Sequence, residues 1–333
     1  MKRALIYFPT KQKAINYEGV RFRKTLKGAC EIKNIPYTDL PRRKYDVANI
    51  VAVRSKEIAL IHKLKRKKIP IIIWALRCEN DPEVRMLERI DGSFQIKEDV
   101  KRVLNEASVV VAPSQAAAKF LSDHGVKKPI EIIKDAVNLE RFDWTKTQEI
   151  NLFYRYFKLQ TDDKIIVSTG GIDEDSALDE VIKIARLVSN AQFFYFAVND
   201  LKTGGKKALE QLRKEAPPNL TISELVPDDV YRSAIMNATI FLEPAKKYAS
   251  TISLMDAMAA KTQIIIRHQA FYPDELINYD TCYVGANFEA LATLIARYLS
   301  GKINDKCDLA YELVCERNLT KHGEEIAKLF EKL

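Results

Sequence analysis

The chain has 333 residues and no long apolar run, and it contains only five cysteines, four histidines and two tryptophans. No run approaches the roughly 18 to 20 apolar residues that a helix needs to span a bilayer. The N-terminal stretch MKRALIYFPTK has a short apolar segment before Pro9, which predicts a first strand rather than a signal peptide. A chain of this length is expected to form two α/β domains.

The cysteines are odd in number and lack the paired spacing typical of a metal site (Cys30, Cys78, Cys282, Cys307 and Cys315). They are expected to be buried or incidental thiols in a reducing cytoplasm. The sequence therefore predicts no metal site, and it shows no motif for a bound cofactor.

The net charge of +8 is unevenly distributed. Residues 1–77 hold 20 Lys and Arg against 5 Asp and Glu, whereas residues 146–333 hold 23 against 27. A basic first half beside a mildly acidic second half indicates that one domain meets a polyanion, either an anionic membrane or a nucleic acid. An ordinary solvated lysine-rich surface is the alternative.

Short runs rich in Val and Ile alternate with helix-length amphipathic stretches, a pattern typical of parallel sheets covered by helices. The first half predicts strands at 4–8, 49–54, 69–76, 108–113 and 130–133, with helices at 18–34, 56–68, 97–106 and 115–124. Ser114 is the expected N-cap and His124 the expected C-cap of the last of these helices.

A second series of short apolar runs alternating with amphipathic stretches begins after residue 145. It predicts strands at 164–170, 191–198, 220–225, 238–244 and 262–267, with helices at 176–189, 205–215, 228–236, 251–260, 287–300 and 308–333. Two doubly wound sheets of about five parallel strands follow from this pattern, without repeats or low-complexity tracts.

Three stretches resemble the family 4 retaining glycosyltransferases, which have the GT-B fold. VVVAPSQAAAKFLSDHGVKKPIEIIKDAVNLERFD is similar to the segment that closes their first domain, with a linker at Asp135–Asn138. NLFYRYFKLQTDDKIIVSTGG resembles the entry into their second domain, and TIFLEPAKKYASTISLMDAMAAKTQIIIR resembles their donor-site segment. Among these enzymes, the chain is most similar to those of Gram-positive bacteria that add a hexose to glucosyl-diacylglycerol.

The resemblance implies an N-terminal domain at 1–145, a nucleotide-sugar domain at 146–315, and a C-terminal helix at 316–333 packing back on the first domain. It also implies UDP-sugar as a donor substrate, bound near Gly170 and Gly171. In the family an Arg and a Lys on that loop stabilise the leaving diphosphate. Here Asp175 and Ser176 stand in their places, which weakens the prediction of donor use.

The family's two donor-site glutamates align with Tyr248 and Asp256. Asp256 is a candidate acceptor for a ribose hydroxyl, with a plain surface acid as the alternative. Lys246 and Lys247 are candidates to restore the missing positive charge. Tyr248 is part of the expected donor site, although it cannot replace a carboxylate acceptor. Thr251 belongs to the same site, because it lies where backbone N–H groups at a helix start can meet a phosphate.

The loop after the third strand lacks the histidine that the family often has there, and the four histidines of the chain lie elsewhere (His62, His124, His268 and His322). Glu79 and Asp81 are the nearby candidates for a catalytic base, although loop carboxylates are more often solvated. In the loop after the first strand, Gly19 and Arg21 are expected near the donor phosphate or the acceptor.

The predicted helices 18–34 and 56–68 are basic and amphipathic, which is typical of a surface that lies on anionic headgroups. The cations concerned are Arg21, Arg23, Lys24, Lys63, Lys65, Arg66, Lys67 and Lys68. The alternative is ordinary packing helices with a solvated lysine face.

Three functions stay open. The first is transfer of a hexose from a nucleotide diphospho-sugar to a membrane glycolipid, in the cytoplasm or on the inner face of the membrane. The second is a lapsed enzyme that binds or stabilises an active glycosyltransferase. The third is a nucleic-acid-associated protein such as a phage-type DNA glycosyltransferase.

Overall fold

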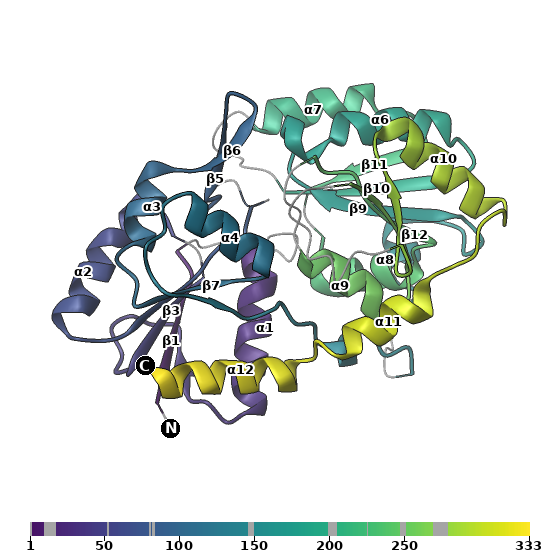
Figure 1. Ribbon diagram of the computed structural model, residues 1–333. Coiled ribbons are helices and arrows are strands. Elements are labelled where there is room, and N and C mark those ends of the chain that lie inside the picture. The colour runs from purple at the N-terminus through teal and green to yellow at the C-terminus, as the bar shows by residue number, and fades with distance from the viewer. Residues whose placement is uncertain are drawn as a thin grey trace. The chain divides into compact units, whose positions relative to one another are not determined.

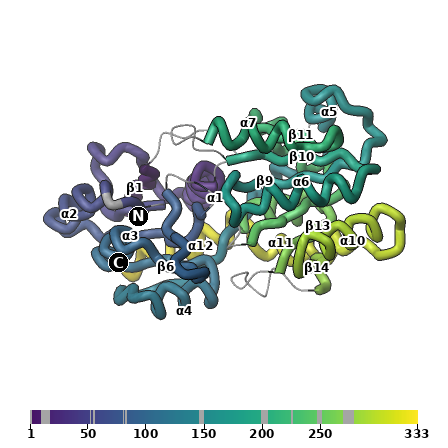
Figure 2. The backbone as a smooth tube through the Cα atoms, turned by 90° about the horizontal axis from the view of Figure 1, so that it is seen from above, coloured from purple at the N-terminus to yellow at the C-terminus, as the bar shows by residue number. Residues whose placement is uncertain are grey.

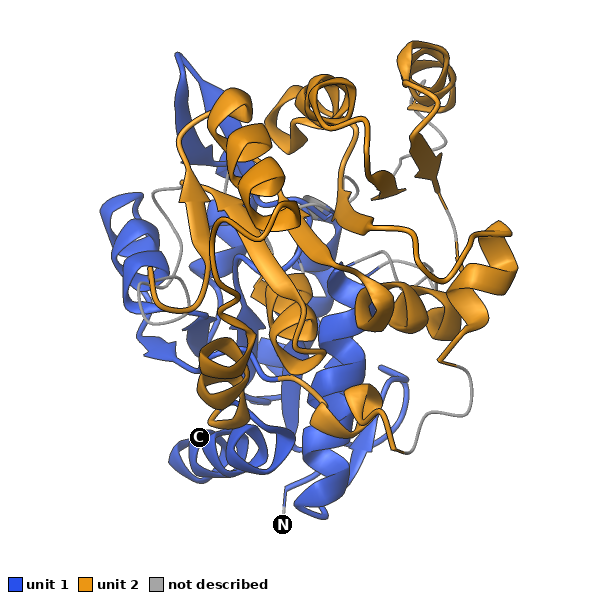
Figure 3. Cartoon of the chain, turned by 90° about the vertical axis from the view of Figure 1, so that its right-hand side faces the viewer, with its two compact units in different colours: residues 1–13, 18–136, 317–333 blue, residues 14–17, 137–316 orange. Residues whose placement is uncertain are grey.

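The computed structural model describes residues 2–9, 18–51, 53–79, 81, 84–145, 150–198, 205–224, 226–246, 251–268 and 279–333. The chain divides into two compact units (Figure 3). Unit 1 contains residues 18–136 and 317–333 together with the first strand, and unit 2 contains residues 137–316. Val137 and Phe142 belong to the hydrophobic core of unit 2, so the segment between residues 137 and 145 is part of unit 2.

Unit 1 is built on a six-stranded parallel sheet with the order β2-β1-β3-β4-β7-β8 (Figure 1). Its strands are β1 (Ala4–Tyr7), β2 (Tyr37–Thr38), β3 (Val47–Ile50), β4 (Ile71–Trp74), β7 (Val109–Ala112) and β8 (Ile130–Ile132). Its helices are α1 (Glu18–Ile32), α2 (Ile58–Arg66), α3 (Glu98–Leu104), α4 (Gln115–Asp123) and α12 (Leu319–Lys332). A short antiparallel hairpin, β5 (Leu87–Ile90) and β6 (Ser93–Ile96), lies between β4 and α3.

Unit 2 repeats the plan with the order β11-β10-β9-β12-β13-β14. Its strands are β9 (Ile165–Gly170), β10 (Gln192–Ala197), β11 (Leu220–Ser223), β12 (Ile240–Glu243), β13 (Gln263–Arg267) and β14 (Tyr283–Gly285). Its helices are α5 (Leu152–Phe157), α6 (Leu178–Leu187), α7 (Gly205–Glu215), α8 (Asp228–Asn237), α9 (Thr251–Ala259), α10 (Phe288–Leu299) and α11 (Cys307–Cys315). Helices α6 and α10 lie side by side (Figure 2).

The predicted pair of doubly wound parallel sheets is confirmed, and each sheet has six strands rather than five. The additional strands, β2 and β14, are edge strands of two and three residues, too short for a hydrophobic pattern to reveal. The predicted helix at 308–333 is two helices, because Asn318 begins α12 as its N-cap by accepting the N–H of Lys321 at 3.0 Å.

Both predicted caps of α4 are confirmed. The Ser114 side chain accepts the N–H of Ala117 at 3.1 Å, and His124 is the C-cap residue. The cysteines are free thiols, and Cys30, Cys78 and Cys282 are buried. Within the described part of the chain, every helix is too short or too polar to span a bilayer.

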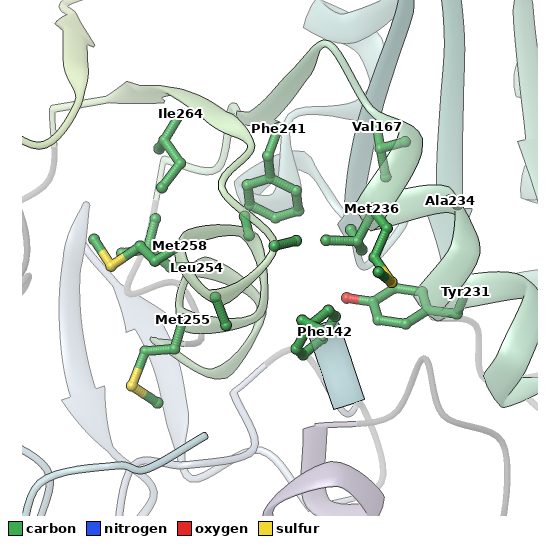
Figure 4. Packing of buried hydrophobic residues seen from close by; sticks show 14 of the residues in the cluster. Phe142, Val167, Tyr231, Ala234, Met236, Phe241, Leu254, Met255, Met258 and Ile264 are labelled. Atoms are coloured by element: carbon green, nitrogen blue, oxygen red, sulfur yellow. The ribbon is translucent and has the colours of Figure 1, made fainter. Parts of the chain in front are cut away.

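Apolar side chains fill both sides of each sheet, as parallel strands require. In unit 2, α9 contributes an entirely buried helix whose Leu254, Met255 and Met258 belong to the same hydrophobic cluster as Phe241 of β12 (Figure 4). This burial fixes the position of α9 against the sheet.

Candidate functional site

Asp81 holds the start of α1 in unit 1. Its carboxylate accepts the backbone N–H of Glu18 at 2.8 Å with one oxygen and that of Gly19 at 2.8 Å with the other. Burial raises the pKa of Asp81 well above its usual value, and the nearby Glu18 raises it further, whereas the two N–H bonds and Arg21 lower it. Asp81, a candidate base from the sequence, is thus a buried helix cap.

Gly19 and Arg21 lie in the first turn of α1, and their contact with a donor phosphate or an acceptor stays a prediction. A Cβ atom at Gly19 would lie 2.3 Å from the Phe8 ring and 3.1 Å from the Asp81 carboxylate, so the glycine is needed for packing. Arg21 is buried in unit 1. Its guanidinium therefore does not contribute to the predicted polyanion surface, because it is withdrawn from solvent.

Glu79, the second candidate base, holds the start of the β5–β6 hairpin. One of its carboxylate oxygens accepts the N–H of Met86 at 3.1 Å, and the other accepts that of Leu87 at 3.0 Å. Glu79 is buried. Both oxygens thus accept backbone N–H groups that hold the start of the hairpin, and the catalytic role of Glu79 stays a prediction.

Arg77 follows β4 by three residues and anchors the end of the first domain. Its buried side chain pairs with Asp135, and it donates a hydrogen bond to the carbonyl of Ile133 at 2.6 Å. The guanidinium carbon also lies 5.1 Å from the centroid of the Trp74 ring. Asp135, which the sequence placed in a linker, thus fixes the linker through a buried ion pair.

In unit 2, the two glycines at the end of β9 leave room for neighbouring side chains. A Cβ atom at Gly170 would lie 2.6 Å from the Tyr195 hydroxyl, and one at Gly171 would lie 2.7 Å from Ser176 Oγ. The Tyr195 hydroxyl donates a hydrogen bond to the carbonyl of Gly171 at 2.6 Å. This loop is therefore closely packed, and its predicted role in donor binding stays a prediction.

Ser176 is fixed inside the same loop. It is buried, and its hydroxyl and backbone N–H both donate to Asp173 Oδ1, at 2.8 and 2.9 Å. Asp173 thereby caps a 3-10 turn over Glu174–Ser176. In the enzymes that the chain resembles, a cation is expected at the position of Ser176. Here that position holds a short polar side chain, which completes this turn.

Positive charge reaches this end of unit 2 from other elements. Lys246, three residues after β12, has its Nζ 3.0 Å from one oxygen of Glu180, in the first turn of α6. Arg267, the last residue of β13, pairs with the other oxygen of Glu180 and donates to the carbonyl of Pro244 at 2.9 Å. Lys246 is a predicted site residue, whereas Arg267 and Glu180 were missed.

The signal that could have found them is present in the sequence. The strand QIIIR consists of a glutamine, three isoleucines and a final arginine, which is its only charged residue. Ligands bind at the carboxyl ends of parallel strands. A polar residue in that position indicates a site more strongly than a lysine in a loop does.

Thr251 and Asp256 of the predicted donor site are both buried on α9. The burial of Asp256 contradicts its alternative interpretation as a surface acid. Lys247 and Tyr248 lie outside the described residues.

The predicted single basic face of helices 18–34 and 56–68 is wrong. The crossover from β1 to β2 through α1 and the crossover from β3 to β4 through α2 run in opposite directions along the sheet. Because such crossovers are right-handed, α1 and α2 cover opposite faces. Arg23 and Lys24 on α1 therefore lie on a different face from the cations of α2.

At the end of α2, Lys65 pairs with Glu106. The neighbouring cations are exposed and make no ion pair within the described part of the chain (Lys63, Arg66, Lys67 and Lys68). We call this group the α2 cation cluster, and its contact with a polyanion stays a prediction.

No model of a protein family matches this chain. The chain is 23% identical, over 99% of its length and 98% of the relative, to the processive diacylglycerol alpha-glucosyltransferase of Acholeplasma laidlawii. It is similar in structure to HepE of Anabaena in complex with UDP-glucose, with a TM-score of 0.75, 11% identity and all of both chains covered. A glycosyltransferase of Rickettsia africae gives a TM-score of 0.69 and 12% identity, covering 99% of this chain and 98% of that one. The chain has the GT-B fold.

Proposed function

We propose that this chain transfers a hexose from a nucleotide diphospho-sugar to a membrane glycolipid, with retention of the anomeric configuration. The observation that carries the proposal is its end-to-end similarity to a diacylglycerol glucosyltransferase. The fold supports a nucleotide-sugar donor, because a structure similar to it contains UDP-glucose. The acceptor, a glycolipid such as glucosyl-diacylglycerol, follows from the relative's lipid substrate.

The donor would bind at the carboxyl ends of β9 and β12. In unit 2 the strand order reverses between these two strands, and ligands of doubly wound sheets bind at such a reversal. Lys246 would face the diphosphate, and Asp256 would accept a hydrogen bond from the ribose. Gly170, Gly171 and Thr251 border the same end of the sheet, and we keep Lys247 and Tyr248 as proposed donor contacts.

The direct test uses the purified full-length chain with radiolabelled UDP-glucose and vesicles that contain glucosyl-diacylglycerol. We expect a labelled diglycosyl lipid with an α-linkage by NMR. Asp256→Asn should reduce transfer, whereas Asp308→Asn, at an exposed position outside the proposed site, should not. A chain that neither binds UDP nor forms product would overturn the proposal.

Peripheral association with an anionic membrane surface is part of the same proposal. It is supported by the lipid-acting relative and by the exposed α2 cation cluster. A protein that works on a glycolipid must reach the headgroup layer, and exposed lysines and arginines attract anionic lipids.

A second candidate is a lapsed enzyme that binds or stabilises a partner glycosyltransferase. It is favoured by the loop after β9, where Ser176 completes a turn with Asp173 and no cation is present between Gly170 and Ile182. Calorimetry with UDP-glucose separates the two functions, since a lapsed enzyme would give no transfer and no measurable donor binding.

A further inference from the structure

Three charged side chains meet at the carboxyl end of the unit 2 sheet, and they come from three different elements. Lys246 follows β12, Arg267 ends β13, and Glu180 lies in the first turn of α6. One carboxylate receives both cations, Lys246 Nζ at 3.0 Å on one oxygen and Arg267 on the other. We call these residues the 180–246–267 cluster.

The cluster lies at the reversal point of the sheet. The N–H of Lys246 donates to the carbonyl of Asp175 at 2.7 Å, which ties the loop after β12 to the loop after β9. Arg267 reaches across from β13 and donates to the carbonyl of Pro244, the first residue after β12. Lys246 is thus tied to the loop after β9, and Arg267 to the first residue after β12, the two strands between which the sheet order reverses.

The loop after β9 cannot itself supply the charge that a diphosphate needs. Residues 170–182 contain no lysine or arginine, and they contain Asp173, Glu174, Asp175, Asp179 and Glu180. An anionic ligand beside this segment requires cations from other parts of the chain. Lys246 and Arg267 are cations that the structure places against it.

We infer that Lys246 and Arg267 form the diphosphate-binding pair of unit 2, with Glu180 as the shared counter-ion that orients both. The inference rests on the proposed function, because it names the contacts of the donor's diphosphate. The positive charge that the loop after β9 lacks would then come from Lys246, which follows β12, and from Arg267, which ends β13.

The geometry suits this role. Arg267 and Glu180 are only 9% and 8% exposed, so their side chains are restrained before any ligand arrives. The Lys246 side chain is 28% exposed, so a ligand can reach it. An ammonium group has three N–H donors and a guanidinium has five, so one carboxylate leaves donors on both cations for phosphate oxygens. With two cations on one anion, the cluster carries a net charge of +1.

The test compares UDP with uridine, which has the same base and sugar but no phosphate. Isothermal titration calorimetry is carried out on the full chain and on Lys246→Met and Arg267→Gln. We expect each variant to bind UDP about tenfold more weakly, equivalent to about 1.4 kcal/mol, and to bind uridine within twofold of the parent. Lys261→Met is the matched control, since it removes a lysine that is paired with Asp308 in the same unit.

The outcomes separate the inference from the function on which it rests. A parent chain that binds UDP with an affinity unchanged in both variants overturns the inference and leaves the proposed function in place. Equal losses for UDP and uridine also overturn it, because they indicate a structural role. A parent chain that does not bind UDP overturns both. Thermal unfolding of each variant checks the fold, and Lys246→Met provides the answer if Arg267→Gln unfolds.

Discussion

One oxygen of the Asp81 carboxylate accepts the backbone N–H of Gly19 at 2.8 Å, at the first turn of α1. The N-terminus of a helix is a natural place for a bound anion. Here the anion is internal, so a ligand phosphate would have to displace a buried carboxylate. The donor contacts expected from Gly19 and Arg21 are therefore better sought in unit 2.

Replacing Asp81 with alanine should lower the free energy of unfolding of unit 1 by about 1–2 kcal/mol, the usual effect of losing a helix cap. The reason is that the N–H groups of Glu18 and Gly19 lose their acceptor in a buried place. Hydrogen exchange of the amides of α1 measures the change. Asp123→Ala, which removes an exposed partner of Lys119, is the control. Unchanged protection in Asp81→Ala would show that the cap is dispensable.

Replacing Gly323 with alanine should loosen α12 from α1. A Cβ atom at Gly323 would lie 2.7 Å from the backbone carbonyl oxygen of Ala29, which cannot move aside without shifting the helix. Overpacking of this kind costs about 1–3 kcal/mol. Limited proteolysis near the C-terminus and thermal unfolding would report the loss.

Gly28→Ala is the matched control at the same helix pair, since its Cβ would lie 3.1 Å from a Leu319 methyl group. That side chain can turn away, so a small effect is expected. Equal destabilisation by the two substitutions would contradict the assignment of Gly323 as the close-approach residue.

Hydrophobic pattern was enough to predict ten of the twelve strands of the two parallel sheets, because most of these strands are runs of buried apolar residues. It could not predict β2 or β14, which contribute two and three residues at sheet edges. The site was harder for a different reason. Glu79 and Asp81 are loop carboxylates in the sequence, and only the coordinates show that backbone N–H groups at residues 18–19 and 86–87 occupy them. Contacts between distant segments leave no local pattern.

The stability of unit 1 should fall as the pH falls, because His322 is buried and must stay neutral. Burial, reinforced by Arg77, lowers the pKa of His322 to about 3, below its value of 6.5 in an unfolded chain. Below pH 6.5, His322 binds a proton in the unfolded chain but stays neutral in the folded chain. This difference removes about 1.5 kcal/mol of stability between pH 6.5 and 5.

Urea unfolding of the parent chain and of His322→Phe across that pH range measures the effect. The variant should lose less stability on acidification, since it has no proton to take up. His62→Gln, at an exposed position on α2, controls for removal of a histidine. Identical pH dependence in the parent chain and His322→Phe would refute the explanation.

Asp175→Arg should strengthen UDP binding by about tenfold at low salt, whereas Ser176→Lys should destabilise unit 2. The first substitution removes a negative charge and adds a positive one on a half-buried side chain beside the 180–246–267 cluster. The second forces a long ammonium side chain into a buried position and removes the hydroxyl that bonds Asp173. Calorimetry and thermal unfolding test the two in parallel. A twofold or smaller change for Asp175→Arg would show that repulsion does not limit donor binding.

The apolar residues of α2 are used inside unit 1. Ile61 and Leu64, the buried apolar residues of α2, pack inside unit 1, so they are not available to insert between lipids. Binding of anionic lipid by the α2 cation cluster would therefore be electrostatic. Such binding weakens as salt rises, because exposed charges are screened beyond about 10 Å at 0.1 M ionic strength.

Replacing Lys63, Arg66, Lys67 and Lys68 together with glutamine should weaken binding to anionic vesicles by roughly 1 kcal/mol per charge, about fivefold each. The fold should be retained, because these side chains are exposed. Co-sedimentation with anionic and neutral vesicles at two salt concentrations measures the effect. The control removes the same number of exposed cations from unit 2 (Lys206, Lys207, Lys214 and Lys302) and should bind like the parent. Equal binding to neutral and anionic vesicles would contradict the proposal that this cluster binds an anionic membrane. Tighter, salt-sensitive binding to duplex DNA would favour a nucleic acid as the partner of this cluster.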